Sequence, residues 1–328
     1  MESVRVLLAL AAQEGWRVHH MDVKSTFLNG DLKEEVYVKQ PPGFTVAGKE
    51  KLVYRLRKAL YGLRQAPRGI GEELLLIGVY VDDLIIIGAS AQAIEGFKAQ
   101  MKKVFDMSDL GLLSFYLGVE VHQDPAGITL RQTHYAKRVL ELGGMDACNP
   151  AHTPMEERLR LSRQSTTVEV DPTQYRRLVG SLHYLVHTRP DLAFLVGFVS
   201  RFMERPTAEH QAAIKRILRD VAGTLEFGLH YTKALGRARF VGYYDSDLAG
   251  DIDTSKSTSG TLFFLGSNLV RWQSVKQKVV ALSSCEAEYI ATTTAATQAI
   301  WLSRLLVDLL GRNVEVVELK LIASLHLL

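Results

Sequence analysis

Cysteine and proline are both scarce in this chain of 328 residues, which contains two cysteines and nine prolines. Neither Cys148 nor Cys285 belongs to a CxxC pair or to a cysteine–histidine spacing, which argues against a disulfide scaffold and a zinc site and fits a reducing compartment. The composition, with 47% hydrophobic and 23% charged residues, is ordinary for a globular protein. The length is enough for two or three domains with real cores.

A long uninterrupted hydrophobic run is also missing. The longest apolar stretch extends from Leu74 to Ala89, and Asp82 and Asp83 break it near its centre. We therefore expect no membrane span, and the absence of a charged-then-apolar leader indicates that the chain is not secreted. The formal net charge of +3 permits a polyanionic partner without requiring one.

The broken stretch VYVDDLIIIG, residues 79–88, is the most informative segment of the chain. Two β-rich runs with a polar interruption predict a β-hairpin that carries Asp82 and Asp83 at its tip. Neighbouring carboxylates repel each other unless a hard cation lies between them. The stretch alone is explained as well by a solvated turn as by a magnesium site, and the solvated turn is the commoner case.

A third carboxylate, Asp22, ends another predicted strand, WRVHHMDV. On its own it is unremarkable, because acids often end strands or cap the next helix. Two magnesium ions about 3.5–4 Å apart can activate an attacking hydroxyl and stabilise a leaving pyrophosphate, and they need carboxylates from neighbouring strands. Asp22 together with Asp82 and Asp83 would supply such a set. The adjacent His19 and His20 are interpreted as ordinary strand residues.

Three runs, HHMDVKSTFLNGDLKEEVYVKQPPGF, LRKALYGLRQAPR and LLIGVYVDDLIIIG, resemble the reverse transcriptase of copia-type retrotransposon polyproteins. The resemblance implies that Asp22, Asp82 and Asp83 are catalytic and hold magnesium ions. It also assigns three residues to the nucleotide pocket, with Phe27 as the aromatic that excludes a ribose 2′-hydroxyl: Phe27, Gln65 and Tyr80. Without the resemblance, a core aromatic on a helix is the preferred interpretation of Phe27.

The middle of the chain is predicted to be helical. Residues 92–108 have helical spacing. Residues 113–121 and 127–132 are predicted as the two strands of a hairpin. The resemblance implies that the FYLG portion of this hairpin contacts the primer. Two apolar helices separated near Pro190 follow a polar linker over residues 149–174. The next helix is amphipathic, with an apolar face formed by Ile214, Ile217, Leu218 and Val221.

From about residue 237 the pattern becomes α/β, and STSGTLFFLG with ALSSCEAEYIA resembles the ribonuclease H domain of the same polyproteins. That resemblance assigns Asp245 as a catalytic metal ligand and Asp247 as peripheral. Ser283 and Glu286 have capping-box spacing, which gives Glu286 a structural role at the helix start. Glu288 lies further into the helix, where it can point toward Asp245, and is therefore the second predicted metal ligand.

Three departures from the family pattern predict a degenerate copy. The chain begins inside the palm, so the fingers are expected to be absent. Only a few residues separate Arg68 from the strand that precedes the acids, which indicates an internal deletion near residues 69–73. No carboxylate follows Glu318, and two acids cannot balance the charge of two divalent ions.

The expected architecture is α+β in three parts: a reverse-transcriptase palm with an antiparallel sheet and helices (1–135), a helical thumb- or connection-like region (136–236), and a truncated α/β ribonuclease H-like domain (237–328). The expected function is that of an RNA-directed DNA polymerase with ribonuclease H, using Mg²⁺ and inactive in this copy. Three alternatives stay open: a non-enzymatic nucleic-acid-binding remnant, a polymerase that is active only when another chain complements it, and an open reading frame that never makes a stable protein. The resemblance implies RNA template, RNA/DNA hybrid and dNTP as partners, no membrane, and an intracellular location, cytoplasmic and particle-associated or nuclear.

Overall fold

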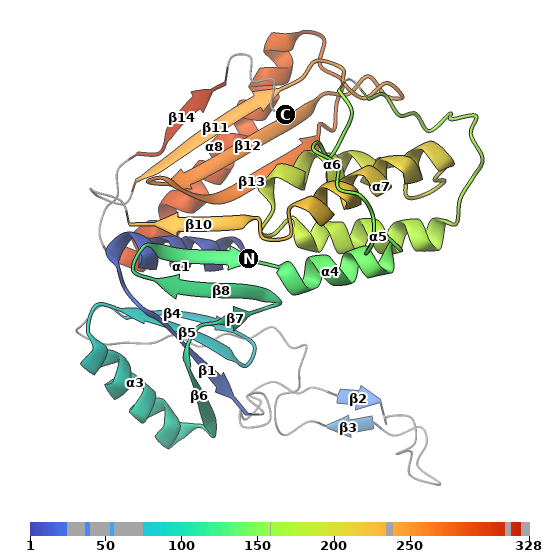
Figure 1. The fold of residues 1–328 in the computed structure, drawn as a ribbon. Coiled ribbons are helices and arrows are strands. Elements are labelled where there is room, and N and C mark those ends of the chain that lie inside the picture. The colour runs from blue at the N-terminus through green and yellow to red at the C-terminus, as the bar shows by residue number, and fades with distance from the viewer. Residues whose placement is uncertain are drawn as a thin grey trace. The chain divides into compact units, whose positions relative to one another are not determined.

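The computed structural model describes residues 1–24, 37–39, 53–55, 75–157, 159–233, 239–311 and 316–322. The chain forms two compact units, one made of residues 17–113 and the other of residues 1–16 and 114–328. Together they make a mixed α+β fold of antiparallel sheets and helices (Figure 1). The predicted parts 1–135, 136–236 and 237–328 follow the domains of the family and not the compactness of the chain, and this division stays a prediction.

The smaller unit is built on a four-stranded antiparallel sheet with the strand order β4-β5-β1-β6. Its elements are β1 (Val18–Val23), β4 (Leu75–Tyr80), β5 (Asp83–Gly88), α3 (Ala91–Val104) and β6 (Met107–Leu112). A separate two-stranded antiparallel pair joins β2 (Tyr37–Lys39) to β3 (Val53–Arg55). The predicted hairpin at the two acids is confirmed, because β4 and β5 pair from Leu75↔Gly88 to Tyr80↔Asp83.

Helix α3 covers one face of this sheet. The Ser90 side chain caps the helix by accepting a hydrogen bond from the backbone amide of Ala93, 3.1 Å away. Side chains alternate between the faces of a strand, so Met21 and Val23 of β1 share the covered face with Leu84 and Ile86 of β5. These residues form a small buried core: Met21, Val23, Leu84, Ile86, Ile94 and Met107. Asp22 and Asp83 consequently lie on the face opposite α3.

The larger unit begins with α1 (Glu2–Glu14), which ends at Gly15 in a left-handed conformation with φ of 72°, a common helix end at glycine. This unit contains the second four-stranded sheet of the protein, with the order β10-β9-β8-β7. Its strands are β7 (Phe115–Tyr116), β8 (Val119–Asp124), β9 (Gly127–Arg131) and β10 (Gly228–Thr232). The prediction of one strand over residues 113–121 was wrong. A tight turn at Leu117 and Gly118, with φ of 47° and 75°, divides it into β7 and β8.

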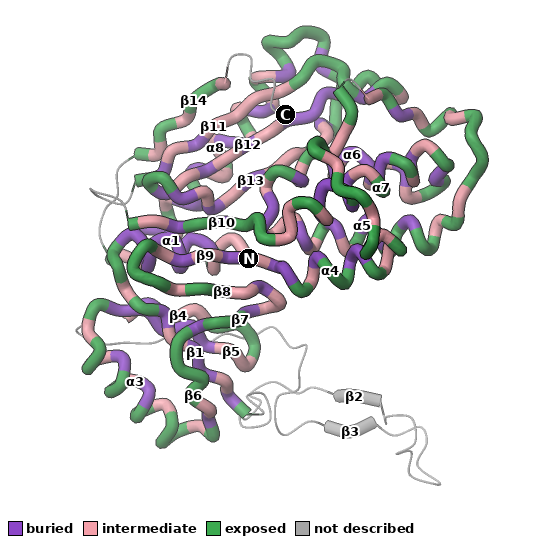
Figure 2. Tube along the Cα trace, viewed as in Figure 1, coloured by how far each residue is buried: buried purple, intermediate pink, exposed green. Residues whose placement is uncertain are grey.

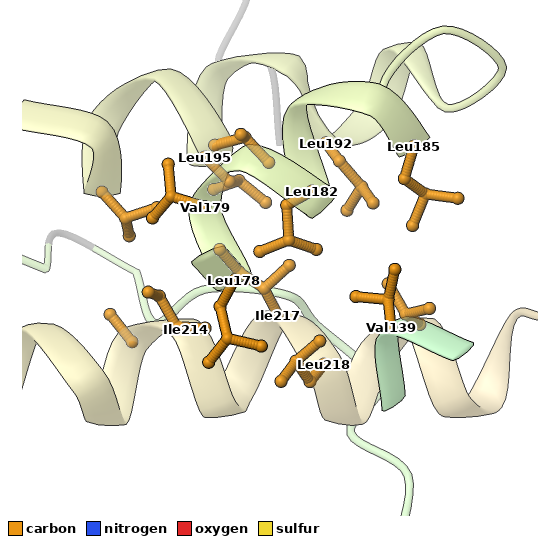
Figure 3. Close-up of a cluster of buried hydrophobic side chains, with 14 of the residues drawn as sticks. Val139, Leu178, Val179, Leu182, Leu185, Leu192, Leu195, Ile214, Ile217 and Leu218 are labelled. Atoms are coloured by element: carbon orange, nitrogen blue, oxygen red, sulfur yellow. The ribbon is translucent and has the colours of Figure 1, made fainter. Parts of the chain in front are cut away.

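The helical middle of this unit has its own apolar core. Its elements are α4 (Thr133–Leu142), α5 (Pro172–Leu185), the 3₁₀ turn η1 (Pro190–Leu192), α6 (Ala193–Val199), η2 (Ser200–Phe202) and α7 (Ala208–Gly223). Figure 3 shows leucine, isoleucine and valine side chains of these helices packed against one another. The predicted break near Pro190 is confirmed, and so is the apolar face of α7, since Ile214, Ile217, Leu218 and Val221 are all buried.

The carboxyl-terminal part contains a third sheet with the order β13-β12-β11-β14. Strands β11 (Phe240–Ser246), β12 (Thr258–Leu265) and β13 (Asn268–Lys276) are antiparallel, whereas β14 (Glu318–Leu321) runs parallel to β11. Helix α8 (Ser284–Leu310) packs on one face, and the alternation of buried and part-exposed residues along the strands is visible in Figure 2. Alanines at every fourth position face the sheet and let the helix approach closely: Ala287, Ala291, Ala295 and Ala299.

Helix α1 contacts both sheets of the larger unit. It packs against β13, β10 and β9. The Arg5 guanidinium donates to the carbonyl of Val270 at 2.8 Å and lies over the ring of Trp272, 4.0 Å from its centroid. No helix in the described parts of the chain combines the length and the hydrophobicity that a membrane crossing requires.

Candidate functional site

The first candidate site is the acidic end of the β4–β5 hairpin in the smaller unit. Strand β1 lies next to β5, and the register places Asp22 directly opposite Asp83. The backbone amide of Val23 donates to the carbonyl of Asp82 at 2.8 Å, which fastens the turn to β1. Because hydrogen-bonded and non-hydrogen-bonded pairs alternate, Asp22 and Asp83 form a non-hydrogen-bonded pair with Cα atoms about 4.5 Å apart. The fold thus brings together two carboxylates that are 61 positions apart in the sequence.

The turn itself is strained. Val81 has a φ of 55°, a left-handed conformation that β-branched residues rarely adopt. Such a conformation costs on the order of 1–3 kcal/mol and persists only where the surroundings determine it. Here the surroundings are the paired strands and the Val23–Asp82 bond. A two-residue hairpin turn itself requires a positive φ at its first loop residue, so the turn imposes this conformation on Val81.

His20 belongs to this site, although the sequence interpretation treated it as an ordinary strand residue. Its Nε2 lies 2.8 Å from Oδ1 of Asp83, and the His20 ring is buried while the Asp83 carboxylate is partly exposed. The signal was available, because residues two apart on a strand share a face and His20 is two positions before Asp22. His19, on the other face, lies 3.0 Å from Nζ of the buried Lys98.

Burial lowers the pKa of His19, and the adjacent Lys98 ammonium lowers it further. Lys98 also contacts Oε1 of Glu95 at 2.9 Å and Oδ2 of Asp109 at 3.3 Å. This network joins α3 to β1 and β6, so we interpret it as structural.

Of the three predicted nucleotide-pocket residues, Tyr80 belongs to the described part of the chain. Tyr80 is the last residue of β4 and is 53% exposed. Its neighbours Val79 and Val81 are also exposed, so the tip of the hairpin presents an apolar surface beside the acids. Phe27 and Gln65 lie outside the described residues.

The second candidate site lies in the larger unit, where β11 ends beside the start of α8. Asp245 is on β11, and Glu288 is in the first turns of α8. The backbone amide of Ser246 donates to Oδ1 of Asp245 at 2.8 Å and to Oε1 of Glu288 at 3.2 Å, so the two carboxylates converge on one amide. Burial raises the pKa of Glu288, and the nearby Asp245 raises it further, although the Ser246 bond opposes both. A divalent cation between the two would relieve this repulsion.

Two other acids near this site have structural partners. The Ser283 hydroxyl accepts a bond from the Glu286 amide, and Oε2 of Glu286 accepts one from the Leu282 amide at 2.7 Å. The predicted capping role of Glu286 is therefore confirmed, with its back-bond one residue earlier than in a regular capping box. Oδ1 of Asp247 accepts from the Thr258 amide at 2.6 Å, and burial raises the pKa of Asp247.

The parallel strand β14 supplies no further acid next to Asp245. Tyr244 is paired with Leu321, and the Ile322 amide donates to the Tyr244 carbonyl at 3.0 Å. Ile322 therefore occupies the position beside Asp245. Both residues line a cavity of about 330 Å³, whose walls also include Phe194 and Trp272.

The donor chemistry of both sites suits Mg²⁺, which prefers carboxylate oxygens. In the second site, Oε2 of Glu288 is buried and has no hydrogen-bond partner among the described residues. In the first, like charges lie directly opposite each other, an arrangement that is destabilising without a cation. The described residues nevertheless contain no group of three or more histidine, cysteine, aspartate or glutamate side chains that could hold a metal ion.

The first 157 residues of the chain match a known protein family. The model of "Reverse transcriptase (RNA-dependent DNA polymerase)" matches residues 1–70 and 67–157. The foamy viral protease–reverse transcriptase, solved in complex with dsDNA, has a TM-score of 0.50 at 12% identity and covers 94% of this chain and 68% of its own. This likeness concerns the fold alone. The family model indicates the reverse transcriptases as the class of protein.

Sequence relatives define the family more closely. The retrovirus-related Pol polyprotein from transposon TNT 1-94 of Nicotiana tabacum is 40% identical over 94% of this chain. An uncharacterized mitochondrial protein of Arabidopsis thaliana is 37% identical over 69% of this chain and 93% of its own length. The chain belongs to the copia-type retrotransposon Pol family. It spans 26% of the length of the TNT 1-94 polyprotein.

Proposed function

We propose that this chain is a remnant of a retrotransposon RNA-directed DNA polymerase with an associated ribonuclease H, and that this copy catalyses neither reaction. The observation that carries the proposal is the pairing of Asp22 with Asp83 across β1 and β5 beside the strained turn at Val81. Like charges directly opposite each other are destabilising without a cation, so a solvated hairpin gains nothing from this pairing. The family membership supports the polymerase origin.

In the polymerase site, Asp22, Asp82 and Asp83 would hold the cation. A bound Mg²⁺ pair would supply activation of the primer hydroxyl and stabilisation of the leaving pyrophosphate. The chain's own contribution is to fix the direction of the carboxylates through the β1–β5 register and the Val23–Asp82 bond. His20 holds Oδ1 of Asp83 and so orients that carboxylate. Phe27, Gln65 and Tyr80 are proposed to line the nucleotide pocket.

In the ribonuclease H-like part, Asp245 and Glu288 would hold a cation. The convergence of both carboxylates on the Ser246 amide supports this proposal. A bound Mg²⁺ would supply activation of the water that attacks the RNA phosphodiester. The Ser246 amide positions one oxygen of Asp245 and one of Glu288. Glu286 is not among the proposed cation ligands, because its carboxylate caps α8.

The loss of activity is proposed on two internal features. The two matches to the family model overlap at residues 67–70, which coincides in part with the interval where we propose a deletion, residues 69–73. Within the described residues of the smaller unit, α3 is the only helix that packs on the sheet. In the larger unit, Ile322 occupies the position next to Asp245. The nearby Asp247 accepts a hydrogen bond from the Thr258 amide, so Asp245 and Glu288 are the two acids proposed as ligands there, where two divalent ions need more.

The proposed partners are an RNA template, an RNA/DNA hybrid and a dNTP, and the proposed location is inside the cell. These proposals rest on the family. The mildly basic balance of the chain, with 39 Lys and Arg against 36 Asp and Glu, is compatible with a polyanion.

Primer extension on an RNA template and cleavage of an RNA/DNA hybrid test the proposal directly. The purified full chain is assayed with and without Mg²⁺, beside Asp83→Asn and Glu288→Gln variants and an active reverse transcriptase as the assay control. We expect the wild type to match its variants in both assays. Cooperative thermal unfolding of each preparation verifies that the protein is folded.

Magnesium-dependent extension that Asp83→Asn abolishes would overturn the proposed inactivity and establish a polymerase. Extension that emerges only on mixing with a second fragment of the polyprotein would instead favour complementation by another chain. Salt-dependent hybrid binding that survives Asp22→Asn and Asp83→Asn, with no catalysis, would favour a nucleic-acid-binding remnant.

A further inference from the structure

The outward side of α8 is unusual for a helix that faces solvent. Between Glu288 and Arg304 the helix carries no charged residue. Three large side chains on this side are exposed: Tyr289 at 76%, Ile300 at 54% and Trp301 at 40%. Exposed helix faces are normally polar or charged, and contiguous exposed apolar surface marks an interaction site.

Threonines make this surface more apolar than the sequence suggests. The hydroxyls of Thr293 and Thr297 donate to the helix's own carbonyls of Tyr289 and Thr293, at 3.0 and 2.9 Å. Their polar groups are thereby satisfied within the helix, and their methyl groups remain for contact. Both residues are exposed, between Tyr289 on one side and Ile300 and Trp301 on the other.

Six of the exposed residues are arranged symmetrically about position 295. Glu286 and Arg304 are each nine positions from the centre, Tyr289 and Trp301 are each six, and Thr293 and Thr297 are each two. All six are exposed, and the average step of 3.6 residues keeps them on one side of the helix. When the same helix is laid antiparallel on itself, each glutamate meets an arginine, each tyrosine meets a tryptophan, and the threonines meet at the centre.

We propose that this face of α8, defined by Glu286, Tyr289, Thr293, Thr297, Trp301 and Arg304, is a self-association surface that a second copy of the chain covers in antiparallel orientation. An isologous two-fold contact requires a patch that is complementary to itself, and this one is. The threonines allow close approach at the centre, the aromatic pairs bury most of the apolar area, and the Glu286–Arg304 pairs fix the direction. One oxygen of Glu286 remains for such a pair, because the cap uses Oε2.

Charge argues against a nucleic acid as the occupant of this face. Arg304 is the only lysine or arginine of α8, whereas phosphate binding needs several cations. The contact runs from Glu286 to Arg304, about 27 Å of helix. One helix face of this length buries less area than a standard protein interface, which buries about 1,200–2,000 Å². We therefore expect a dimer with a dissociation constant in the micromolar range, in rapid exchange with the monomer.

Sedimentation velocity of the full chain over a range of concentrations tests the proposal. We expect the wild type to shift from monomer to dimer, and the Tyr289→Asp/Trp301→Asp double variant to remain monomeric. Val168→Asp is the matched control, because Val168 is a 79% exposed apolar residue outside α8, and it should dimerise like the wild type. A wild type that stays monomeric at about 500 µM, or a double variant that still dimerises, would overturn the proposal.

Cross-linking tests the antiparallel register separately. In a background with Cys148→Ser and Cys285→Ser, Thr293→Cys and Thr297→Cys variants are prepared singly. The register places residue 293 of one copy opposite residue 297 of the other, within the roughly 4.4–6.8 Å Cα separation that a disulfide spans. We expect oxidation to link the mixed variants and to leave each variant alone unlinked. Linking of Thr293→Cys to itself as readily as to Thr297→Cys would contradict the register.

Discussion

Replacing Gly242 by alanine tests the packing that places β14 beside β11. A Cβ atom on Gly242 would lie 2.5 Å from Cε1 of Phe263 and 2.6 Å from Cδ2 of Leu319. Carbon atoms pack best at about 3.5–4.0 Å, and the Phe263 ring is fully buried, so it has little room to move. Overpacking of this kind destabilises by about 1–3 kcal/mol. Without the two contacts, alanine would instead stabilise the strand by about 0.5–1 kcal/mol relative to glycine.

The sign of the change in the free energy of unfolding therefore decides whether Gly242 is packed as closely as described, and urea unfolding of the full chain measures that free energy. We expect Gly242→Ala to lower the free energy of unfolding, and Gly242→Ala/Leu319→Ala to recover part of the loss. Gly260→Ala in the adjacent strand is the control, because its Cβ would meet no atom within 4 Å, and it should be neutral or stabilising. A Gly242→Ala variant at least as stable as the wild type would refute the docking of β14 on which the Ile322 argument depends.

Three further predictions concern stability. Nε2 of His210 donates to the Ser162 carbonyl and Nδ1 accepts from the Thr207 amide. Burial lowers the His210 pKa, so the unfolded chain binds more protons and stability falls as the pH drops below about 6.5. His210→Gln should flatten that slope in unfolding titrations at several pH values, and an unchanged slope would argue against a neutral His210. Val81→Gly should relieve the turn and raise stability by up to about 1 kcal/mol, and a loss measured by denaturant would show that the turn is unstrained. Leu182→Ala, in a fully buried position, should cost about 3–5 kcal/mol in the same assay, and a cost below about 1 kcal/mol would contradict the helical core.

Local patterns were sufficient to predict several elements. The polar interruption at Asp82 and Asp83 predicts the hairpin because strands require apolar alternation and turns tolerate acids. The Ser283–Glu286 spacing predicts the start of α8, since capping is a short-range interaction. Gly15 marks the end of α1 for the same reason, because a left-handed residue suits glycine.

Long-range packing has no comparable signal in the sequence. Helix α1 packs on β13, some 260 positions away, and no local pattern predicts that partner. The left-handed Val81 contradicts the preference of valine and is imposed by the strands around it. The turn at Leu117 and Gly118 was missed because FYLGVEV continues the apolar alternation of a strand. The position of His20 two residues before Asp22 places both on one face of β1, but its partner Asp83 comes from a different strand, and the sequence does not name that partner.

Thermal unfolding with and without Mg²⁺ is the most direct test of the convergence of Asp22 with the Asp82–Asp83 turn. A cation that binds only the folded chain raises its stability, so we expect MgCl₂ to raise the unfolding temperature of the wild type. In a Glu288→Gln background, which removes the second candidate site, Asp22→Asn should lose most of the remaining rise, whereas Asp106→Asn, an exposed acid of the same unit, should keep it. An Asp22→Asn variant that responds to Mg²⁺ like its Glu288→Gln parent would contradict a shared cation site.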